Sequence, residues 1–158
     1  MFYQDQKNIT EKSASGQTKK YSYDGDHVIA EYNGSDQLTA YFIYGPGHDN
    51  PICMINVAPS TQSETWYYYH SDGLGLITAI TDTNGDVKET YQYSPFGRQT
   101  IFDENNQQIS SSAIDNPYMF TARRVACPER SRGNQETSLY YYRARYYNPK
   151  IGKFLQTD

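Results

Sequence analysis

The stretch that decides the fold is Leu139–Asp158, which reads LYYYRARYYNPKIGKFLQTD. Five tyrosines within residues 140–147, without helical spacing, predict a β-strand. Along one continuous strand, alternation would place Tyr140, Tyr142, Ala144 and Tyr146 on the better buried face, and Leu139, Tyr141, Arg143, Arg145 and Tyr147 on the other. Asn148–Ile151 predicts a turn, and Gly152 can adopt positive φ before a strand at 153–155. We therefore expect a tyrosine-rich hairpin.

A β-meander is predicted for residues 21–44, because apolar runs alternate there with Asx-Gly turn pairs. The runs are Tyr21–Tyr23, Val28–Tyr32 and Leu38–Tyr44, separated by Asp24-Gly25 and Asn33-Gly34. Residues 1–20 are polar and form a ragged entry or a partial repeat. The region 45–64 is predicted to be loop around a short strand at Ile52–Val57, and Gln99–Pro117 to carry at most a short strand and a flexible loop.

The meander pattern recurs about fifty residues later. Asp36–Tyr41 followed by Tyr44–Pro46 matches Asp86–Tyr91 followed by Tyr93–Pro95, and Val28–Ala30 matches Leu76–Thr78. Internal similarity at this spacing indicates stacked supersecondary units, each of which leaves unpaired edges when it stands alone. The predicted fold class is all-β, with antiparallel hairpin repeats forming a curved sheet.

Composition excludes several classes of protein. The net charge is −4, so the chain lacks the basic surface of a nucleic-acid-binding protein. No apolar run is long enough for a transmembrane helix, and the N-terminus does not resemble a signal peptide. Tyrosine, with 17 copies, must supply much of the core. Cys53 and Cys127 could form a disulfide, but buried or incidental thiols are the favoured interpretation.

Three ligand or catalytic sites were weighed against structural interpretations. Asp82–Asp86 spaces oxygen atoms as calcium loops do, but an Asn-Gly turn explains the segment, and no metal or cofactor is expected. His70 and Asp72 could be a catalytic pair, although a histidine that anchors a turn is favoured. The rings of residues 66–69 could stack on a carbohydrate, but aromatic cladding of a sheet is the preferred interpretation.

Four ordered segments carry a family resemblance: YYHSDGLG at 68–75, YSPFGR at 93–98, NPYMFT at 116–121 and the 139–155 run. Together they resemble the RHS repeat-associated core of bacterial RHS/YD-repeat proteins. The resemblance assigns family-motif structural roles to Tyr69, His70, Asp72, Gly73, Gly75, Pro95, Phe96, Gly97, Arg98, Arg123, Tyr141, Tyr142, Arg143, Arg145, Tyr146, Tyr147, Pro149, Gly152 and Phe154. Ala122 and Ser138 stand where the family has glycine, and residues 124–135 are expected to be an exposed insertion loop.

By this resemblance, residues 21–115 are RHS/YD-type repeats and residues 116–158 are an incomplete core that ends before the family's Asp-Pro-x-Gly motif. The family builds a hollow spiral β-shell, secreted or at the cell surface, that encloses a C-terminal polymorphic toxin. The implied partners are further RHS repeats of a parent chain and the enclosed toxin. Core domains of this kind self-cleave as aspartyl autoproteases, for which Asp158, Arg145 and Arg143 are the weak catalytic candidates here. We expect a non-enzymatic fragment of the shell wall and plug; an autoprotease remnant and a carbohydrate-binding surface module are the alternatives.

Overall fold

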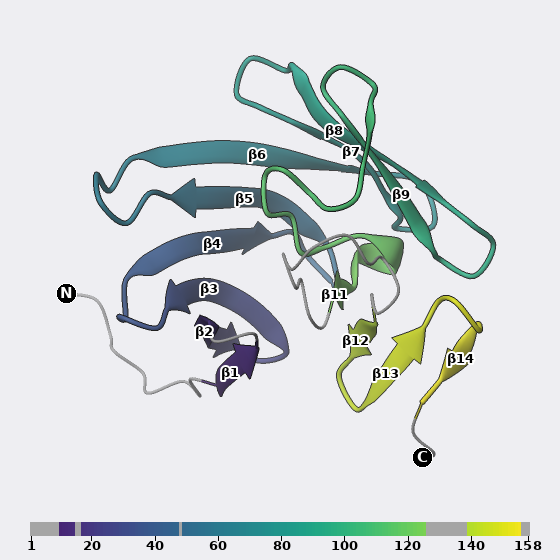
Figure 1. Cartoon of the computed structure of the whole chain (residues 1–158), viewed down its shortest axis with the longest axis horizontal. Helices are drawn as coiled ribbons and strands as arrows, with labels where there is room; N and C mark the ends of the chain where they lie inside the picture. Colours follow the sequence, from purple (N-terminus) through teal and green to yellow (C-terminus); the bar gives the residue numbers. More distant parts are fainter. Residues whose placement is uncertain (1–9, 15–16, 48, 126–138, 156–158) are drawn as a thin grey trace.

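Ten strands form one continuous antiparallel meander in the computed structural model, which describes residues 10–14, 17–47, 49–125 and 139–155. Each strand pairs with the next along the chain, and Figure 1 shows the sheet curving around a concave side. The strands are β1 (Thr10–Ala14), β2 (Gln17–Asp24), β3 (His27–Asn33), β4 (Leu38–Tyr44), β5 (Pro51–Val57), β6 (Glu64–Ser71), β7 (Ile77–Thr81), β8 (Val87–Tyr93), β9 (Gln99–Asp103) and β10 (Gln108–Ile109).

A second, four-stranded antiparallel sheet follows the large one. It contains β11 (Arg124–Val125), β12 (Tyr140–Tyr142), β13 (Arg145–Asn148) and β14 (Lys153–Phe154), and the short 3-10 helix η1 (Phe120–Ala122) precedes it. Figure 1 shows the segment that leads into this sheet lying on the concave side of the large one. The all-β prediction is confirmed. No helix in the described part of the chain is long and apolar enough to cross a membrane.

The large sheet repeats with a period of 49 residues. The first unit comprises β2–β5 and the second comprises β6–β9. In the first unit the Tyr44 hydroxyl donates to the Val28 carbonyl oxygen at 2.7 Å, and in the second the Tyr93 hydroxyl donates to the Ile77 carbonyl oxygen at 2.7 Å. Both partners shift by the same amount, because 93 − 44 and 77 − 28 are each 49. Asp36 and Asp86 are 50 residues apart, so the alignment of these two residues was wrong by one residue. At the spacing of 49 residues, Asp86 corresponds to Gln37.

Asx turns close four of the hairpins. The side-chain oxygens of Asn33, Asp72, Asp82 and Asp103 each accept two backbone N–H groups, from the second and fourth residues that follow. This arrangement fixes a turn through local side-chain hydrogen bonds. At Asp82 it occupies one carboxylate oxygen, while Lys88 lies 3.5 Å from the other. The turn interpretation of 82–86 therefore holds, and among the described residues no group of three acidic, histidine or cysteine side chains could hold a metal.

The tyrosine run does not form one strand, so that prediction was wrong. Tyr140–Tyr142 and Arg145–Asn148 are separate antiparallel strands that pair Tyr140 with Tyr147, and the turn between them places Arg143 at φ 59°. The reversal moves Tyr147 to the face of Tyr140 and invalidates the predicted alternation. The Arg143 side chain pairs with Asp26 and Asp49, which are so distant in the chain that local sequence does not reveal them as partners. The predicted turn at 148–151, with Gly152 at φ 64°, is confirmed.

Three further segments differ from expectation. Gln99–Ile109 forms two strands, β9 and β10, where at most one was expected, and strands β1 and β2 begin within the supposedly ragged residues 1–20. Arg124 lies in β11 with 11% of its side chain exposed, although the region from 124 onward was expected to be an exposed loop. The rest of that loop, residues 126–138, lies outside the described residues, as do His48, Cys127 and Asp158. Cys53 is a buried free thiol on β5.

Two apolar clusters fill the concave side. One centres on Ile77, Ile80, Tyr91, Ile101 and Tyr140, and the other on Tyr21, Val28, Phe42, Met54 and Tyr118. The cluster around Ile80 joins β7, β8 and β9 to the small sheet. The cluster around Met54 joins β2, β3, β4 and β5 to Tyr118. Sequence-distant residues 118–125 and 140 thus complete cores that neither repeat unit closes alone.

Replacement of Ala122 by glycine is expected to stabilise the protein. Ala122 is buried and has φ 51°, a left-handed conformation that costs a residue with a Cβ about 1–2 kcal/mol. Loss of one buried methyl offsets about 0.8 kcal/mol of that gain. We expect Ala122→Gly to raise the free energy of unfolding by about 0.5–1 kcal/mol in urea titrations. Buried Ala40 is the matched control without positive φ, and its replacement by glycine should destabilise; equal destabilisation by both changes would contradict the strain at residue 122.

Candidate functional site: the buried network under the closing segment

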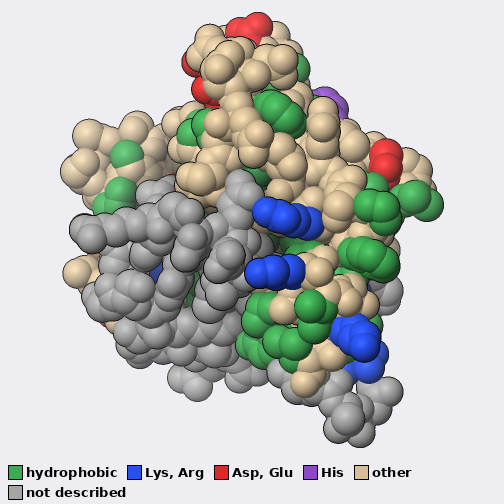
Figure 2. Space-filling model, turned by 45° about the vertical axis from the view of Figure 1, so that its right-hand side comes forward, with side chains coloured by type: hydrophobic (Ala, Val, Ile, Leu, Met, Phe, Trp, Pro, Cys, Tyr) green, Lys and Arg blue, Asp and Glu red, His purple; other side chains and the backbone are tan. Residues whose placement is uncertain are grey.

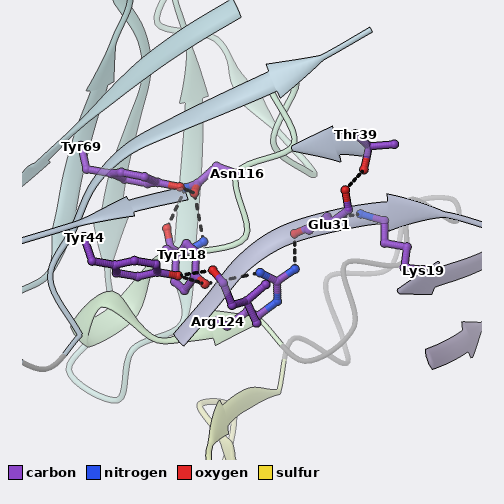
Figure 3. A network of polar contacts seen from close by, with 9 residues as sticks. Lys19, Glu31, Thr39, Tyr44, Tyr69, Asn116, Tyr118 and Arg124 are labelled. Carbon is purple, nitrogen blue, oxygen red and sulfur yellow. Dashed lines mark hydrogen bonds and ion pairs between the residues drawn. The ribbon is translucent and has the colours of Figure 1, made fainter. Parts of the chain in front are cut away.

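The site is built around residues 112–125, here called the closing segment, which lie on the concave side of the large sheet. At its centre is Asn116, which is 3% exposed. Its amide nitrogen donates to the Tyr118 carbonyl oxygen at 2.7 Å and to the Tyr91 hydroxyl at 3.0 Å. Its amide oxygen accepts from the Tyr69 hydroxyl and the Tyr118 N–H, both at 2.9 Å (Figure 3). Asn116 thereby connects β6, β8 and the closing segment through one fully satisfied amide.

Glu89 anchors the start of the closing segment. Its carboxylate has no solvent exposure and accepts hydrogen bonds from the Tyr91 hydroxyl, the Ser112 hydroxyl and the N–H groups of Ala113 and Ile114. Four donors compensate for the burial of this carboxylate, which would otherwise be costly. Burial, followed by the proximity of Glu89, raises the pKa of Tyr91 well above its ordinary value, so Tyr91 stays a donor.

Tyr118 inserts its ring among aromatic side chains of the first unit and β6. Its centroid lies 5.4 Å from Phe42, 6.1 Å from Tyr44 and 6.2 Å from Tyr69, all in edge-to-face geometry. The Tyr44 and Tyr118 hydroxyl oxygens are 2.6 Å apart. Because Tyr44 gives its single proton to Val28, Tyr118 must be the donor to Tyr44. Burial raises the pKa of Tyr44 far above its ordinary value, so Tyr44 keeps its proton and remains a donor.

Arg124, next to the end of the closing segment, is a largely buried cation with 11% of its side chain exposed. Its guanidinium pairs with the Glu31 carboxylate and lies over the Tyr21 ring, 4.8 Å from the centroid (Figure 3). Lys19 approaches the other Glu31 oxygen at 3.1 Å. Burial alone would raise the pKa of Glu31, but the charges of Arg124 and Lys19 outweigh it and lower that pKa. Burial would likewise lower the pKa of Arg124, but Glu31 raises it, so both groups stay charged.

A second ionic group, the outer clasp, joins the small sheet to the first repeat unit. Arg123 contacts Asp49 at 2.8 Å, and Arg143 contacts Asp49 at 3.4 Å and Asp26 at 3.3 Å. Asp49 has φ 56°, and it lines one pocket together with Ala122 at φ 51° and Arg143 at φ 59°. Asp26 and Asp49 each face guanidinium groups and serve as their counter-ions.

The small sheet packs on the β8–β9 turn. The Tyr147 hydroxyl donates to the Phe96 carbonyl oxygen at 2.9 Å, and the Tyr140 hydroxyl donates to the Gly97 carbonyl oxygen at 3.1 Å. Gly97 has φ 84°, and a Cβ atom there would lie 2.5 Å from the Phe120 ring. The glycine is therefore required both by its backbone conformation and by the close approach of Phe120.

Many of the residues singled out by family resemblance lie in the Asn116 network, in the outer clasp or beside the β8–β9 turn. Tyr69 belongs to the Asn116 network, and Arg123 and Arg143 belong to the outer clasp. Phe96, Gly97, Tyr142, Tyr147, Gly152 and Phe154 pack together between the small sheet and the β8–β9 turn. His70 instead bonds the Thr81 hydroxyl at 2.9 Å, and Asp72 caps its own turn, so no hydrogen bond joins His70 to Asp72.

The remaining members have peripheral positions. Arg145 lies over the Phe154 ring at 4.1 Å, and the rings of Tyr141 and Tyr146 face each other across β12 and β13. Gly73, Gly75, Pro95, Arg98 and Pro149 lie in turns. Tyr67 and Tyr69 face the core clusters, so the rings of residues 66–69 do not form one surface.

Sequence reasoning missed Glu31, Glu89, Asn116, Tyr118 and Arg124 as a set. A usable signal existed for Glu89, because it alternates with Val87 and Tyr91 on one face of its strand. A charged residue at such a position needs a buried partner. Simple alternation does not reveal Glu31, because a register shift between β2 and β3 brings it to the face of Val28. The partner Arg124 is 93 residues distant from Glu31 in the chain, which no local pattern indicates.

A curved antiparallel wall of 49-residue units, closed on its inside by a polar-anchored segment, defines a shell-type β-protein. Residues 72–101 match the family model of the RHS repeat, so this part of the chain is an RHS repeat. Its relatives include the tRNA nuclease WapA of Bacillus subtilis strain 168, 30% identical over 158 residues, which cover 99% of this chain and 6% of that protein. The double-stranded DNA deaminase toxin A of Burkholderia cenocepacia is 21% identical over 156 residues, or 90% of this chain and 10% of the toxin.

Solved structures show the same fold. The TcdB2-TccC3 crystal structure superposes with a TM-score of 0.61 at 21% identity, covering 95% of this chain and 7% of that chain. A Photorhabdus luminescens Tc holotoxin pore gives a TM-score of 0.64 at 19% identity, with the same coverage. The chain thus spans between 6% and 10% of the length of these curated relatives.

Proposed function

We propose that this chain forms part of the wall and the inner plug of an RHS β-shell that encloses and presents a toxic polypeptide. The observation that carries the proposal is the closing segment, which is anchored to the concave side of the wall by Glu89, Asn116 and Arg124. These anchors connect both repeat units to one insert, as a plug that seals a shell requires. The toxin relatives WapA and the DNA deaminase support a shell of the toxin-associated type.

On this proposal the partners are further RHS repeats, which would extend the wall, and an enclosed toxin. The intact protein would act outside the cell that makes it. The chain itself would contribute no catalysis, because Arg143 is engaged with Asp26 and Asp49, and Arg145 stacks on Phe154. Incubation of the purified chain should leave one species; a discrete shorter product that disappears in Asp158→Asn would favour the autoprotease interpretation.

A chimera tests the shell proposal. The chain would replace its matching region in Bacillus subtilis WapA, and limited proteolysis would measure the accessibility of the C-terminal polypeptide. We expect this polypeptide to resist protease in the chimera and to be cleaved when the chimera carries Arg124→Met, since that change detaches the plug. A second chimera with Lys88→Met, which alters an exposed ion pair with Glu104 whose two members both lie outside the closing segment, should stay resistant. Equal sensitivity of all three would contradict the proposed role.

A further inference from the structure

One edge of the molecule exposes apolar side chains on adjoining turns. Phe96 is 59% exposed, Ile151 is 55% exposed and Leu155 is 49% exposed. They are contiguous, because Gly152 packs beneath the Phe96 ring, where an added Cβ would lie at 2.8 Å, and Phe154 contacts Tyr147 with centroids 5.3 Å apart. We call the surface formed by residues 94–98 and 145–155 the basic edge. Figure 2 shows green apolar side chains beside blue Lys and Arg side chains on this side of the molecule.

The basic edge has a charge opposite to that of the rest of the chain. It carries Arg98, Arg145, Lys150 and Lys153 and contains no Asp or Glu. With a whole-chain charge of −4, an edge of +4 leaves −4 − 4 = −8 on the remaining residues. Arg98 and Lys153 are exposed and make no ion pair with a described residue. Segregation of this kind predicts an anionic binding partner.

The position of the apolar side chains favours a deformable partner, such as a lipid surface, over a partner that fits a groove. Phe96 and Ile151 lie on the β8–β9 and β13–β14 turns, so they project outward instead of lining a groove. Aromatic and aliphatic groups surrounded by Lys and Arg are the combination that inserts at a bilayer interface, where cations contact anionic headgroups. We propose that the basic edge binds the surface of an anionic lipid bilayer.

Vesicle sedimentation tests the proposal with the 158-residue chain. One set of vesicles would contain phosphatidylglycerol in phosphatidylcholine, and the other phosphatidylcholine alone. We expect binding to the anionic set, weakened by salt because exposed charges are screened. Lys153→Gln should reduce the partition coefficient about fivefold, since a cation near an anionic surface contributes about 1 kcal/mol. Ile151→Asp should abolish measurable binding.

Val87→Asp is the matched control, because Val87 is 45% exposed and lies at the opposite end of β8 from the Phe96 turn. It should bind as the unchanged chain does, and thermal melting would verify that all three variants fold. Absence of binding to anionic vesicles would overturn the proposal, as would equal loss in Ile151→Asp and Val87→Asp. Sedimentation velocity without lipid provides a third outcome: salt-sensitive self-association that Ile151→Asp removes, without vesicle binding, would make the edge a protein interface and refute the membrane assignment.

Discussion

Arg124→Met is expected to destabilise the protein by about 3–5 kcal/mol, because it leaves the buried Glu31 carboxylate without its guanidinium partner. Methionine retains much of the apolar stem, so lost packing contributes little to the effect. Lys19 approaches Glu31 from a partly exposed position and can compensate only in part. The measurement is the free energy of unfolding in a urea titration.

A second substitution separates the charge effect from a general intolerance at this site. Adding Glu31→Gln to Arg124→Met removes the unpaired charge, so the double variant should be more stable than Arg124→Met alone. Lys88→Met, which alters an exposed ion pair, should have little effect. If Arg124→Met unfolds no more readily than Lys88→Met, the closing segment is not anchored by this pair.

Gly97→Ala is expected to lower the free energy of unfolding by about 2–5 kcal/mol. The left-handed backbone conformation accounts for about 1–2 kcal/mol, and overpacking against the Phe120 ring adds about 1–3 kcal/mol. The small sheet should therefore detach from the β8–β9 turn more easily. Thermal unfolding and urea titration both report this loss.

Gly85→Ala is a closely matched control, because Gly85 has φ 86° but no atom within 4 Å of the position a Cβ would occupy. It should show the backbone cost alone, about 1–2 kcal/mol. Combining Gly97→Ala with Phe120→Leu should recover part of the difference by removing ring atoms. Equal effects of the two alanine substitutions would show that the Phe120 contact is absent in solution.

Local sequence patterns predicted much of the wall. Asx-Gly turns and apolar alternation placed the strands from β3 to β8, because hairpins depend on residues close in the chain. Prediction was incomplete where the structure depends on distant partners. Arg143 forms ion pairs with Asp26 and Asp49, and Arg124 forms an ion pair with Glu31. All of these partners are distant in the chain. The fifty-residue alignment was one residue too long because it followed sequence identity at Asp36 and Asp86 rather than the Tyr44 and Tyr93 hydrogen bonds.

The candidate site was predicted in pieces. Family resemblance identified Tyr69, Arg123 and the aromatic residues of the small sheet, and the structure places them at the two junctions of the molecule. It did not identify the carboxylates of Glu31 and Glu89. Their roles depend on burial in the folded protein. A carboxylate that is exposed to water needs no partner, whereas burial of an unpaired carboxylate costs free energy.

The central claim is that the closing segment is an integral part of the wall. Hydrogen exchange at individual amides tests this claim most directly. The informative N–H groups are those of Ala113, Tyr118 and Val125, which donate to Glu89, to Asn116 and to the Pro117 carbonyl oxygen. If the account is correct, these amides exchange only through global unfolding and share the protection of β3 and β8. Rapid exchange at all three while β3 and β8 stay protected would show that the segment opens independently, which would contradict the account.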